Sequence, residues 1–273
     1  MLSTRLKKIV GVSIGSVTAK LVPGMAALYL AGCLVVIGLN LGQLPAALGA
    51  IWDGAFTAAG VQGGVIGALI QGFRRAAFSN EAGLGSAAIA HSTVRTREPV
   101  TEGFVALWEP FIDTVVICTM TALVIIISGE LAALQGSALS GTAQGVALTS
   151  KAFASVVWWF PYLLTVVVFL FAFSTIITWA YYGAKAASFL AKESKVVLYG
   201  FKLFFLCMAV VGASMNLGSI VDIADALMFI MAIPNLIGVY LLMPVVRREL
   251  QSYEARLRAG EIRAAARPVV PAG

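Results

Sequence analysis

Residues 156–181 read VVWWFPYLLTVVVFLFAFSTIITWAY, a run of 26 residues without one charged side chain. A membrane-spanning helix needs about 20 mainly apolar residues, because the hydrocarbon core of a bilayer is about 30 Å thick. A run this long and this free of charge predicts a helix that crosses a membrane.

The composition of the whole chain agrees with this interpretation. Of its 273 residues, 60% are hydrophobic and 12% are charged, and the mean hydropathy is +0.93. Soluble domains carry about 25% charged residues. Half that charge cannot cover a water-soluble body of this size, which excludes a soluble enzyme, and the high hydrophobicity excludes disorder. We expect an all-helical integral membrane protein.

Further apolar segments divide the chain into three parts. Residues 1–20 are predicted to be a cytoplasmic lead-in, 21–246 a transmembrane domain, and 247–273 a basic cytoplasmic tail. The six predicted spans are 22–42, 62–92, 104–129, 156–181, 197–217 and 226–246. The second of these spans is the least regular, and we expect it to be a broken helix.

The basic residues predict the orientation of these spans. Fifteen of the 19 lysines and arginines fall at the two termini and in alternate connections, whereas only Lys151 falls in the opposite connections. The opposite connections instead carry four acidic residues, namely Asp53, Glu130, Asp222 and Asp225. Basic residues collect on the cytoplasmic side of a membrane protein. We therefore expect a multi-pass protein of the inner (plasma) membrane with both termini in the cytoplasm, and the net charge of +6 indicates topology and not a nucleic-acid partner.

The span 62–92 carries three ionised side chains near its middle, Arg74, Arg75 and Glu81. A charge at the centre of a bilayer costs at least about 2.5–3.5 kcal/mol. Three of them exclude a simple lipid-facing helix, so this segment must face a watery cavity or other protein. The sequence leaves open whether the two arginines gate an outer vestibule or only anchor it.

Within this span, residues 78–86 read FSNEAGLGS and predict an interrupted helix. Ser79 and Asn80 are good N-caps for a second half-helix, Glu81 suits its first turn, and the two glycines relax the backbone. A helix that restarts in mid-membrane offers free N–H groups to a carboxylate and free carbonyls to a small cation. The alternative is a glycine packing face with charges that extend to the membrane surface.

A second polar cluster, Ser174 and Thr175, lies in the run 156–181. Its hydroxyl and backbone oxygens could coordinate a cation, but hydroxyls in membrane helices more often bond to their own backbone or to a neighbouring helix. Asp113, in the span 104–129, needs a polar partner, and either an ion relay or a structural hydrogen bond would provide one. For His91 we expect a polar contact near the cytoplasmic interface.

No nucleophile elbow, zinc-protease pattern or phosphate loop occurs in the sequence. We therefore predict neither an enzymatic activity nor a cofactor. An ion channel has little support, because no pore-lining ring or filter sequence is present.

Several ordered stretches resemble those of one transporter family, the alanine or glycine:cation symporters, also called sodium:alanine symporters. The stretches are FSNEAGLGSA at 78–87, FIDT at 111–114, CTMTALV at 118–124, FSTII at 173–177, YYG at 181–183 and MAIPN at 231–235. The resemblance covers most of residues 20–250. It implies the inverted-repeat fold of the amino acid–polyamine–organocation superfamily, in which two five-helix repeats hold substrate and sodium between their broken first helices.

The resemblance also implies which residues bind. The broken span resembles the first helix of the second repeat, and the helix at 156–181 resembles the third. The implied substrate-binding residues are Phe78, Ser79, Asn80, Glu81, Ala82 and Gly83. The implied sodium ligands are Phe171, Ser174 and Thr175.

The implied function is sodium-coupled symport of a small neutral amino acid, alanine or glycine, across the plasma membrane, with the lipid bilayer as surroundings. Members of the family are considerably longer than this chain. The span 22–42 resembles the last helix of the first repeat, so we expect a truncated C-terminal part, or a half that assembles with a missing N-terminal half or second chain. The alternative is a non-transporting membrane subunit or degenerate remnant that lacks a complete site.

Overall fold

The computed structural model describes residues 22–56, 64–133 and 142–262. Every regular element in these ranges is helical, and no strand occurs among them. The predicted lead-in, residues 1–20, and the last part of the predicted tail, residues 263–273, lie outside the described residues.

The helices follow one another with short connections. In chain order they are a first helix Val22–Leu39, the 3-10 turn η1 Leu41–Gln43, α2 Leu44–Phe56, α3 Gly64–Asn80, α4 Ser86–His91, α5 Pro99–Pro110, the π-helix η2 Phe111–Cys118, α6 Thr119–Ile127, α7 Glu130–Ala133, α8 Thr142–Ala154, α9 Phe160–Leu190, α10 Lys195–Ser214 and α11 Leu217–Arg258.

Five helical stretches of the described chain are long and apolar enough to cross a bilayer. They are Val22–Leu39, Pro99–Ile127, Phe160–Leu190, Lys195–Ser214 and Gly218–Arg258. These stretches correspond to five of the six predicted spans, and the sixth, at 62–92, is divided between α3 and α4. Helix α9 begins at 160 and not at 156, because Pro161 occupies its first turn, where a proline is favoured.

Large apolar side chains cover the outer faces of the long helices. No residue of the most apolar 18-residue stretch of α10 or of α11 is buried, and Leu190, Val196 and Leu241 are each more than 70% exposed. Soluble monomers rarely expose apolar patches larger than a few hundred Å². Such surfaces are stable in lipid, and the molecule is a multi-pass membrane protein.

The tightest packing lies where the first helix, α6, α8 and α9 meet. The buried residues of this core are Cys33, Val36, Val124, Ala152, Phe153, Phe160 and Leu164. The rings of Phe153 and Phe160 stack with their centres 4.2 Å apart. Gly32 faces the second ring so closely that a Cβ there would collide with it. The core therefore depends on shape, with a glycine where an aromatic ring needs the space.

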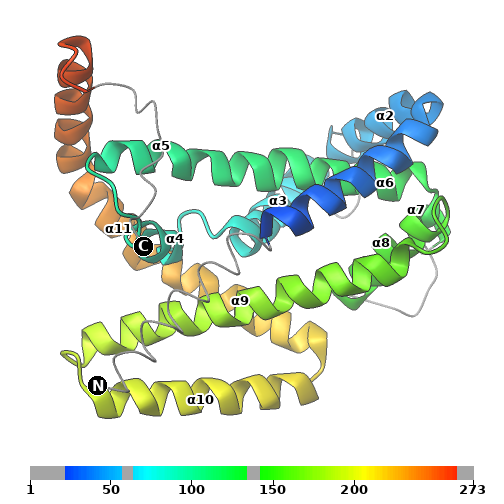
Figure 1. The fold of residues 1–273 in the computed structure, drawn as a ribbon. Helices are drawn as coiled ribbons and strands as arrows, with labels where there is room; N and C mark the ends of the chain where they lie inside the picture. Colours follow the sequence, from blue (N-terminus) through cyan, green and yellow to red (C-terminus); the bar gives the residue numbers. More distant parts are fainter. Residues whose placement is uncertain (1–21, 57–63, 134–141, 263–273) are drawn as a thin grey trace.

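The long helices run back and forth between two ends of the molecule (Figure 1). The α4–α5 connection, the α9–α10 turn and the C-terminal end of α11 lie at one end, on the left of the view, and α7 and the α10–α11 turn lie at the other. Basic Arg95, Arg97 and Lys192 belong to the first set of connections, whereas Asp222 and Asp225 belong to the beginning of α11. These three basic residues and two acidic residues therefore belong to connections at opposite ends of the molecule.

Candidate functional site

The interruption predicted at residues 78–86 is observed between α3 and α4, at residues 81–85. Three residues there have positive φ angles, Glu81 at 57°, Gly83 at 84° and Gly85 at 93°. Glycine adopts this left-handed conformation without steric cost, whereas a side chain such as that of glutamate adopts it uncommonly. The two glycines thus let the chain turn out of one half-helix and into the next.

Helix α11 contacts this turn through Asn235. Its amide Nδ2 donates a hydrogen bond of 2.8 Å to the carbonyl oxygen of Gly83. A Cβ on Gly85 would lie 3.1 Å from the Asn235 Oδ1 atom, which is closer than an ordinary contact. Glycine is needed here for the close approach of α11 as well as for the backbone conformation.

Asn80 closes the end of α3 and does not begin α4. Its Oδ1 accepts a hydrogen bond of 3.0 Å from the N–H of Ala82, and its Nδ2 donates one of 2.7 Å to the Thr114 hydroxyl. The N-cap position of α4 is held by Gly85, which has no side chain to cap with. The prediction that Ser79 and Asn80 cap the second half-helix is therefore wrong, because the turn adds residues 81–85 between them and the first turn of α4.

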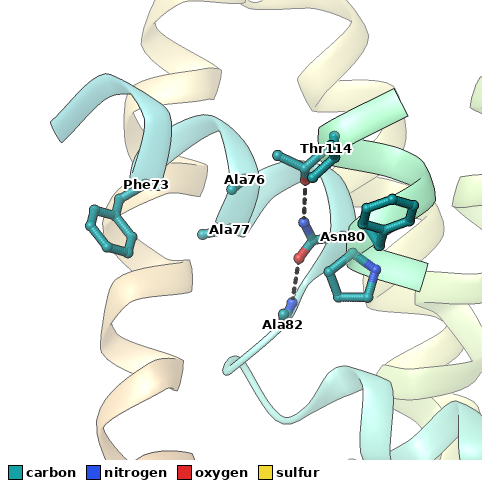
Figure 2. Close-up of a pocket in the computed structure, with 9 residues that line it drawn as sticks. Phe73, Ala76, Ala77, Asn80, Ala82 and Thr114 are labelled. Atoms are coloured by element: carbon teal, nitrogen blue, oxygen red, sulfur yellow. Dashed lines mark hydrogen bonds between the residues drawn. The ribbon is translucent and has the colours of Figure 1, made fainter. Parts of the chain in front are cut away.

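An open pocket of about 500 Å³ lies beside Asn80 (Figure 2). Its wall is mostly apolar, with the Asn80 amide and the Thr114 hydroxyl as polar groups. The lining residues are Phe73, Ala76, Ala77, Asn80, Ala82, Pro110, Phe111, Thr114 and Val115. Ligand pockets commonly combine such apolar walls with a few polar groups that fix orientation.

Of the six predicted substrate-binding residues, Asn80 and Ala82 line this pocket, and the other four do not. Phe78 is half-exposed, with the guanidinium of Arg75 at 5.7 Å from its ring centre. Ser79 is exposed, Glu81 is partly buried in the turn, and the Gly83 carbonyl is occupied by Asn235. The structure thus brings together a smaller set than the sequence predicted.

The hydroxyl groups of the predicted sodium site bond within their own helix. Ser174 and Thr175 in α9 both donate to the carbonyl oxygen of Phe171, at 2.8 and 3.0 Å. Ser174 is buried and Thr175 is exposed. Each hydroxyl oxygen keeps lone pairs that could accept a cation. Helix α9 packs against α4 and contributes no residue to the pocket beside Asn80.

A charged cluster joins α3 to the first turns of α11. Asp225 is only 4% exposed, and its Oδ2 accepts hydrogen bonds from Arg74 at 2.8 Å and from Arg75 at 2.5 Å. Asp222, which is largely exposed, lies 3.7 Å from Arg74. The two arginines of the broken span are therefore paired within the protein, as the cost of leaving a charge in lipid requires.

The opposite end of the site is also linked by polar contacts. The His91 ring lies 2.7 Å from a Glu102 oxygen through Nδ1 and 3.3 Å from a Glu109 oxygen through Nε2, which confirms the predicted polar contact. Arg256, far along α11, forms two hydrogen bonds of 2.9 and 2.7 Å with the Glu98 carboxylate. Helix α11 is thus tied to α3 through Asp225 and to the beginning of α5 through Arg256.

Thr114, Asn235 and Asp225 are functional candidates that sequence reasoning did not place in the site. Thr114 appeared in the sequence analysis only within the stretch FIDT at 111–114, and Asp225 only as a residue of a connection between spans. A signal for Asp225 was present, because two arginines inside a predicted span require an acidic partner. No comparable signal identified which asparagine contacts the turn.

Comparison with known proteins supplies a family. The family described as the sodium:alanine symporter family matches residues 9–267. The chain is 38% identical over 242 residues to the "Sodium/alanine symporter AgcS" of Methanococcus maripaludis, which covers 88% of this chain and 52% of that protein.

Two Bacillus subtilis proteins match over a similar range. The "Probable sodium/glutamine symporter GlnT" is 37% identical, with 91% of this chain and 51% of that protein covered. The "Amino-acid carrier protein AlsT" is 33% identical, with 93% and 52% covered. The chain spans about half the length of the curated relatives it matches.

Proposed function

The chain belongs to the sodium:alanine symporter family, and on that premise we propose that it takes part in sodium-coupled symport of a small neutral amino acid, alanine or glycine. The family is one of transporters and not of enzymes, in agreement with the sequence prediction. The observation that carries the proposal is the interrupted helix, whose last residue before the turn, Asn80, places its amide in an open pocket.

The proposed substrate site is built on Asn80 and Ala82, with Phe78, Ser79, Glu81 and Gly83 completing it as the helix halves move. The Asn80 amide and the Thr114 hydroxyl supply the polar groups that a zwitterionic amino acid requires, and the small side chains of Ala76 and Ala77 leave room for a small substrate. One relative is named a probable sodium/glutamine symporter, so the size of the substrate side chain is the property to test.

The proposed sodium site uses the Phe171 carbonyl and the hydroxyls of Ser174 and Thr175. Both hydroxyls converge on one carbonyl oxygen, which concentrates three oxygen atoms in one turn of α9. Small hard cations prefer oxygen ligands. The contact between α9 and α4 would let an ion there hold the second half-helix in position.

We further propose an inner-membrane location with both termini in the cytoplasm, and the inverted-repeat arrangement in which this chain contributes the second repeat. The support is the separation of basic and acidic connections to opposite ends of the molecule (Figure 1). In this arrangement the Arg74–Asp225 pair faces outward and the Glu98–Arg256 pair faces inward.

Uptake into proteoliposomes tests the function. With sodium outside and potassium inside, the wild-type chain should accumulate labelled alanine or, where the other repeat is needed to carry it across, bind it, and Asn80→Ala should abolish both. Asn40→Ala is the matched control, because the Asn40 amide donates to the Val36 carbonyl at the end of the first helix, away from the pocket. A well-folded chain that neither binds nor accumulates alanine or glycine would favour a non-transporting subunit and contradict the proposal.

A further inference from the structure

Lys202 is a charged residue inside one of the membrane-spanning helices. It lies in α10, about 10 Å along the axis from Lys195, the first residue of that helix. The 20 residues of α10 extend about 30 Å, which is only enough to cross the hydrocarbon core of a bilayer. The backbone of Lys202 therefore lies about a third of the way across the membrane. A charge at this depth is costly and needs a counter-charge.

The described part of the chain supplies no counter-charge. Lys195 and Lys202 are both exposed, and among the described residues no carboxylate forms an ion pair with either of them. Glu193, in the turn between α9 and α10, accepts a hydrogen bond of 2.9 Å from the Ser188 hydroxyl of α9 instead. The anion that neutralises these lysines must come from elsewhere.

The two lysines share an outer face of α10 with a tyrosine. Helix α10 lies at the edge of the molecule with α9 along one side (Figure 1), and its Phe201 ring packs against Gly183 of α9. Lys195, Tyr199 and Lys202 have the spacing i, i+4, i+7, which places them on one face of the helix. All three side chains are exposed. This face is open to the surroundings of the protein.

The ammonium group of Lys202 is directed toward the nearer membrane surface. It lies 5.7 Å from the centre of the Tyr199 ring, and Tyr199 is one turn closer to the beginning of α10. Helical side chains lean toward the N-terminus of their helix, which for α10 lies at the turn that follows α9. A lysine can lay its apolar stem along the helix and keep its charge at headgroup level, where tyrosine is also enriched.

Lys185 in α9 shows why the direction of the helix matters. Its ammonium group lies 5.8 Å from the centre of the Tyr181 ring, which is nearly the same contact. However, α9 ends at the turn where α10 begins, so Tyr181 lies farther from that membrane surface than Lys185. The ammonium group of Lys185 is therefore directed away from the headgroups, and that of Lys202 toward them.

We propose that α10 binds an anionic phospholipid of the leaflet at the α9–α10 turn, which is the cytoplasmic leaflet in the orientation proposed above. Lys195 and Lys202 contact the phosphate, and the Tyr199 hydroxyl donates a hydrogen bond to it. The apolar residues that continue this face deeper into the membrane contact the acyl chain and are each more than 60% exposed, namely Leu203, Leu206 and Val210. Charge complementarity selects this occupant, because basic side chains at headgroup depth attract anionic lipids.

Competition between two lipids on the purified 273-residue chain tests the site. Dioleoyl phosphatidylglycerol and dioleoyl phosphatidylcholine have the same acyl chains and differ in headgroup charge. Added in equal amounts to the protein in neutral detergent, they can be counted per chain by native mass spectrometry. The wild type should retain the anionic lipid with a preference of at least about tenfold.

Substitutions on α10 locate the bound lipid. The double variant Lys195→Gln, Lys202→Gln should retain one phosphatidylglycerol fewer per chain than the wild type, whereas Lys195→Arg, Lys202→Arg keeps both charges and should retain it. Lys185→Gln is the matched control and should bind as the wild type does, because its ammonium group is directed away from the headgroups. An unchanged lipid count in the double glutamine variant, or an equal loss in Lys185→Gln, would overturn the proposal.

Two further measurements distinguish the lipid from other occupants. Inorganic phosphate at millimolar concentration should not displace phosphatidylglycerol, because it lacks the acyl chain, and full displacement would indicate a site for free anions. The number of chains per particle should be the same in the wild type and the double glutamine variant. A change in that number without a change in the lipid count would show that this face contacts protein. Either contrary result overturns the proposal, and neither bears on symport.

Discussion

Around Phe153, side chains from the first helix, α6, α8 and α9 fill space against one another, whereas around Asn80 the chain is held by hydrogen bonds from two neighbouring helices. In the first region two aromatic rings stack at 4.2 Å. In the second, the Asn80 amide donates a hydrogen bond of 2.7 Å to the Thr114 hydroxyl, and the Asn235 amide donates one of 2.8 Å to the carbonyl of the turn. A close-packed core loses contacts whenever the volume of one of its side chains changes. A single hydrogen bond contributes only about 1 kcal/mol to stability.

This difference indicates which of the two regions can move. Ligand-binding segments are drawn from the least stable parts of a protein, and a turn held by a few directional bonds can rearrange at low cost. The packed core supplies a fixed frame against which such a rearrangement is possible. The predictions that follow separate the two regions by stability and by ligand binding.

The largest expected effect is in the core. Phe153→Ala removes a fully buried, stacked ring and should lower the free energy of unfolding by about 3 kcal/mol or more, visible as a fall in Tm of the detergent-solubilised protein. Phe169→Ala removes a ring of the same size that is 68% exposed on α9 and should change Tm little. Equal losses in the two variants would show that the core is not packed as described.

The next largest effect concerns the charged cluster. Asp225→Asn leaves two arginines without their shared carboxylate and should cost about 2–3 kcal/mol, near the lower limit for a broken buried pair because the arginines are partly exposed. Asp222→Asn, at 3.7 Å and 77% exposed, should cost less than about 0.5 kcal/mol. Thermal unfolding of both variants measures the difference, and a reversed order would contradict the assignment of Asp225 as the anchor.

A smaller effect is expected at the contact between α11 and the turn. Asn235→Ala removes the bond to Gly83 and should cost about 1 kcal/mol, with faster amide hydrogen exchange at residues 81–85. Asn216→Ala removes the cap of α11, where the side chain accepts from the Gly218 N–H at 2.9 Å, and should cost a similar amount. Only the first variant should speed exchange in the turn, and similar exchange in both would show that Asn235 does not hold it.

The smallest effect on stability is expected in α9. Ser174→Ala removes a hydroxyl that bonds to its own helix, so Tm should change by little, while sodium affinity should fall several-fold if the oxygen is a ligand. Thr178→Ala is the control, because Thr178 bonds back to the Ser174 carbonyl in the same way and lies outside the proposed site. An equal fall in sodium affinity, or none in either variant, would remove Ser174 from the site.

Hydropathy and glycine spacing were sufficient to predict much of the fold. The five long helices follow from apolar runs whose length matches a bilayer, and the interruption follows from Gly83, Gly85 and the charges in the same span. These are local properties, since each depends on residues adjacent in the sequence.

The hydrogen-bond and ion-pair partners of these side chains could not be predicted, because the partners are distant in sequence. Asn80 was expected to cap the following helix, but its amide bonds to Thr114, 34 positions away. Asp225 lies 151 positions from Arg74, and nothing in either local sequence specifies the other. The sequence therefore located the break but not the side chains that hold it.

The most direct test of the account is the thermal stabilisation of the purified chain by alanine, measured in sodium and in potassium. A ligand that binds the folded state raises Tm by an amount that grows with the logarithm of its concentration relative to Kd. We predict that alanine raises the Tm of the wild type in sodium, that the rise is much smaller in potassium, and that Asn80→Ala loses it while keeping the Tm of the ligand-free protein within a few degrees. Stabilisation by alanine that survives unchanged in Asn80→Ala would contradict the interrupted helix as the binding site.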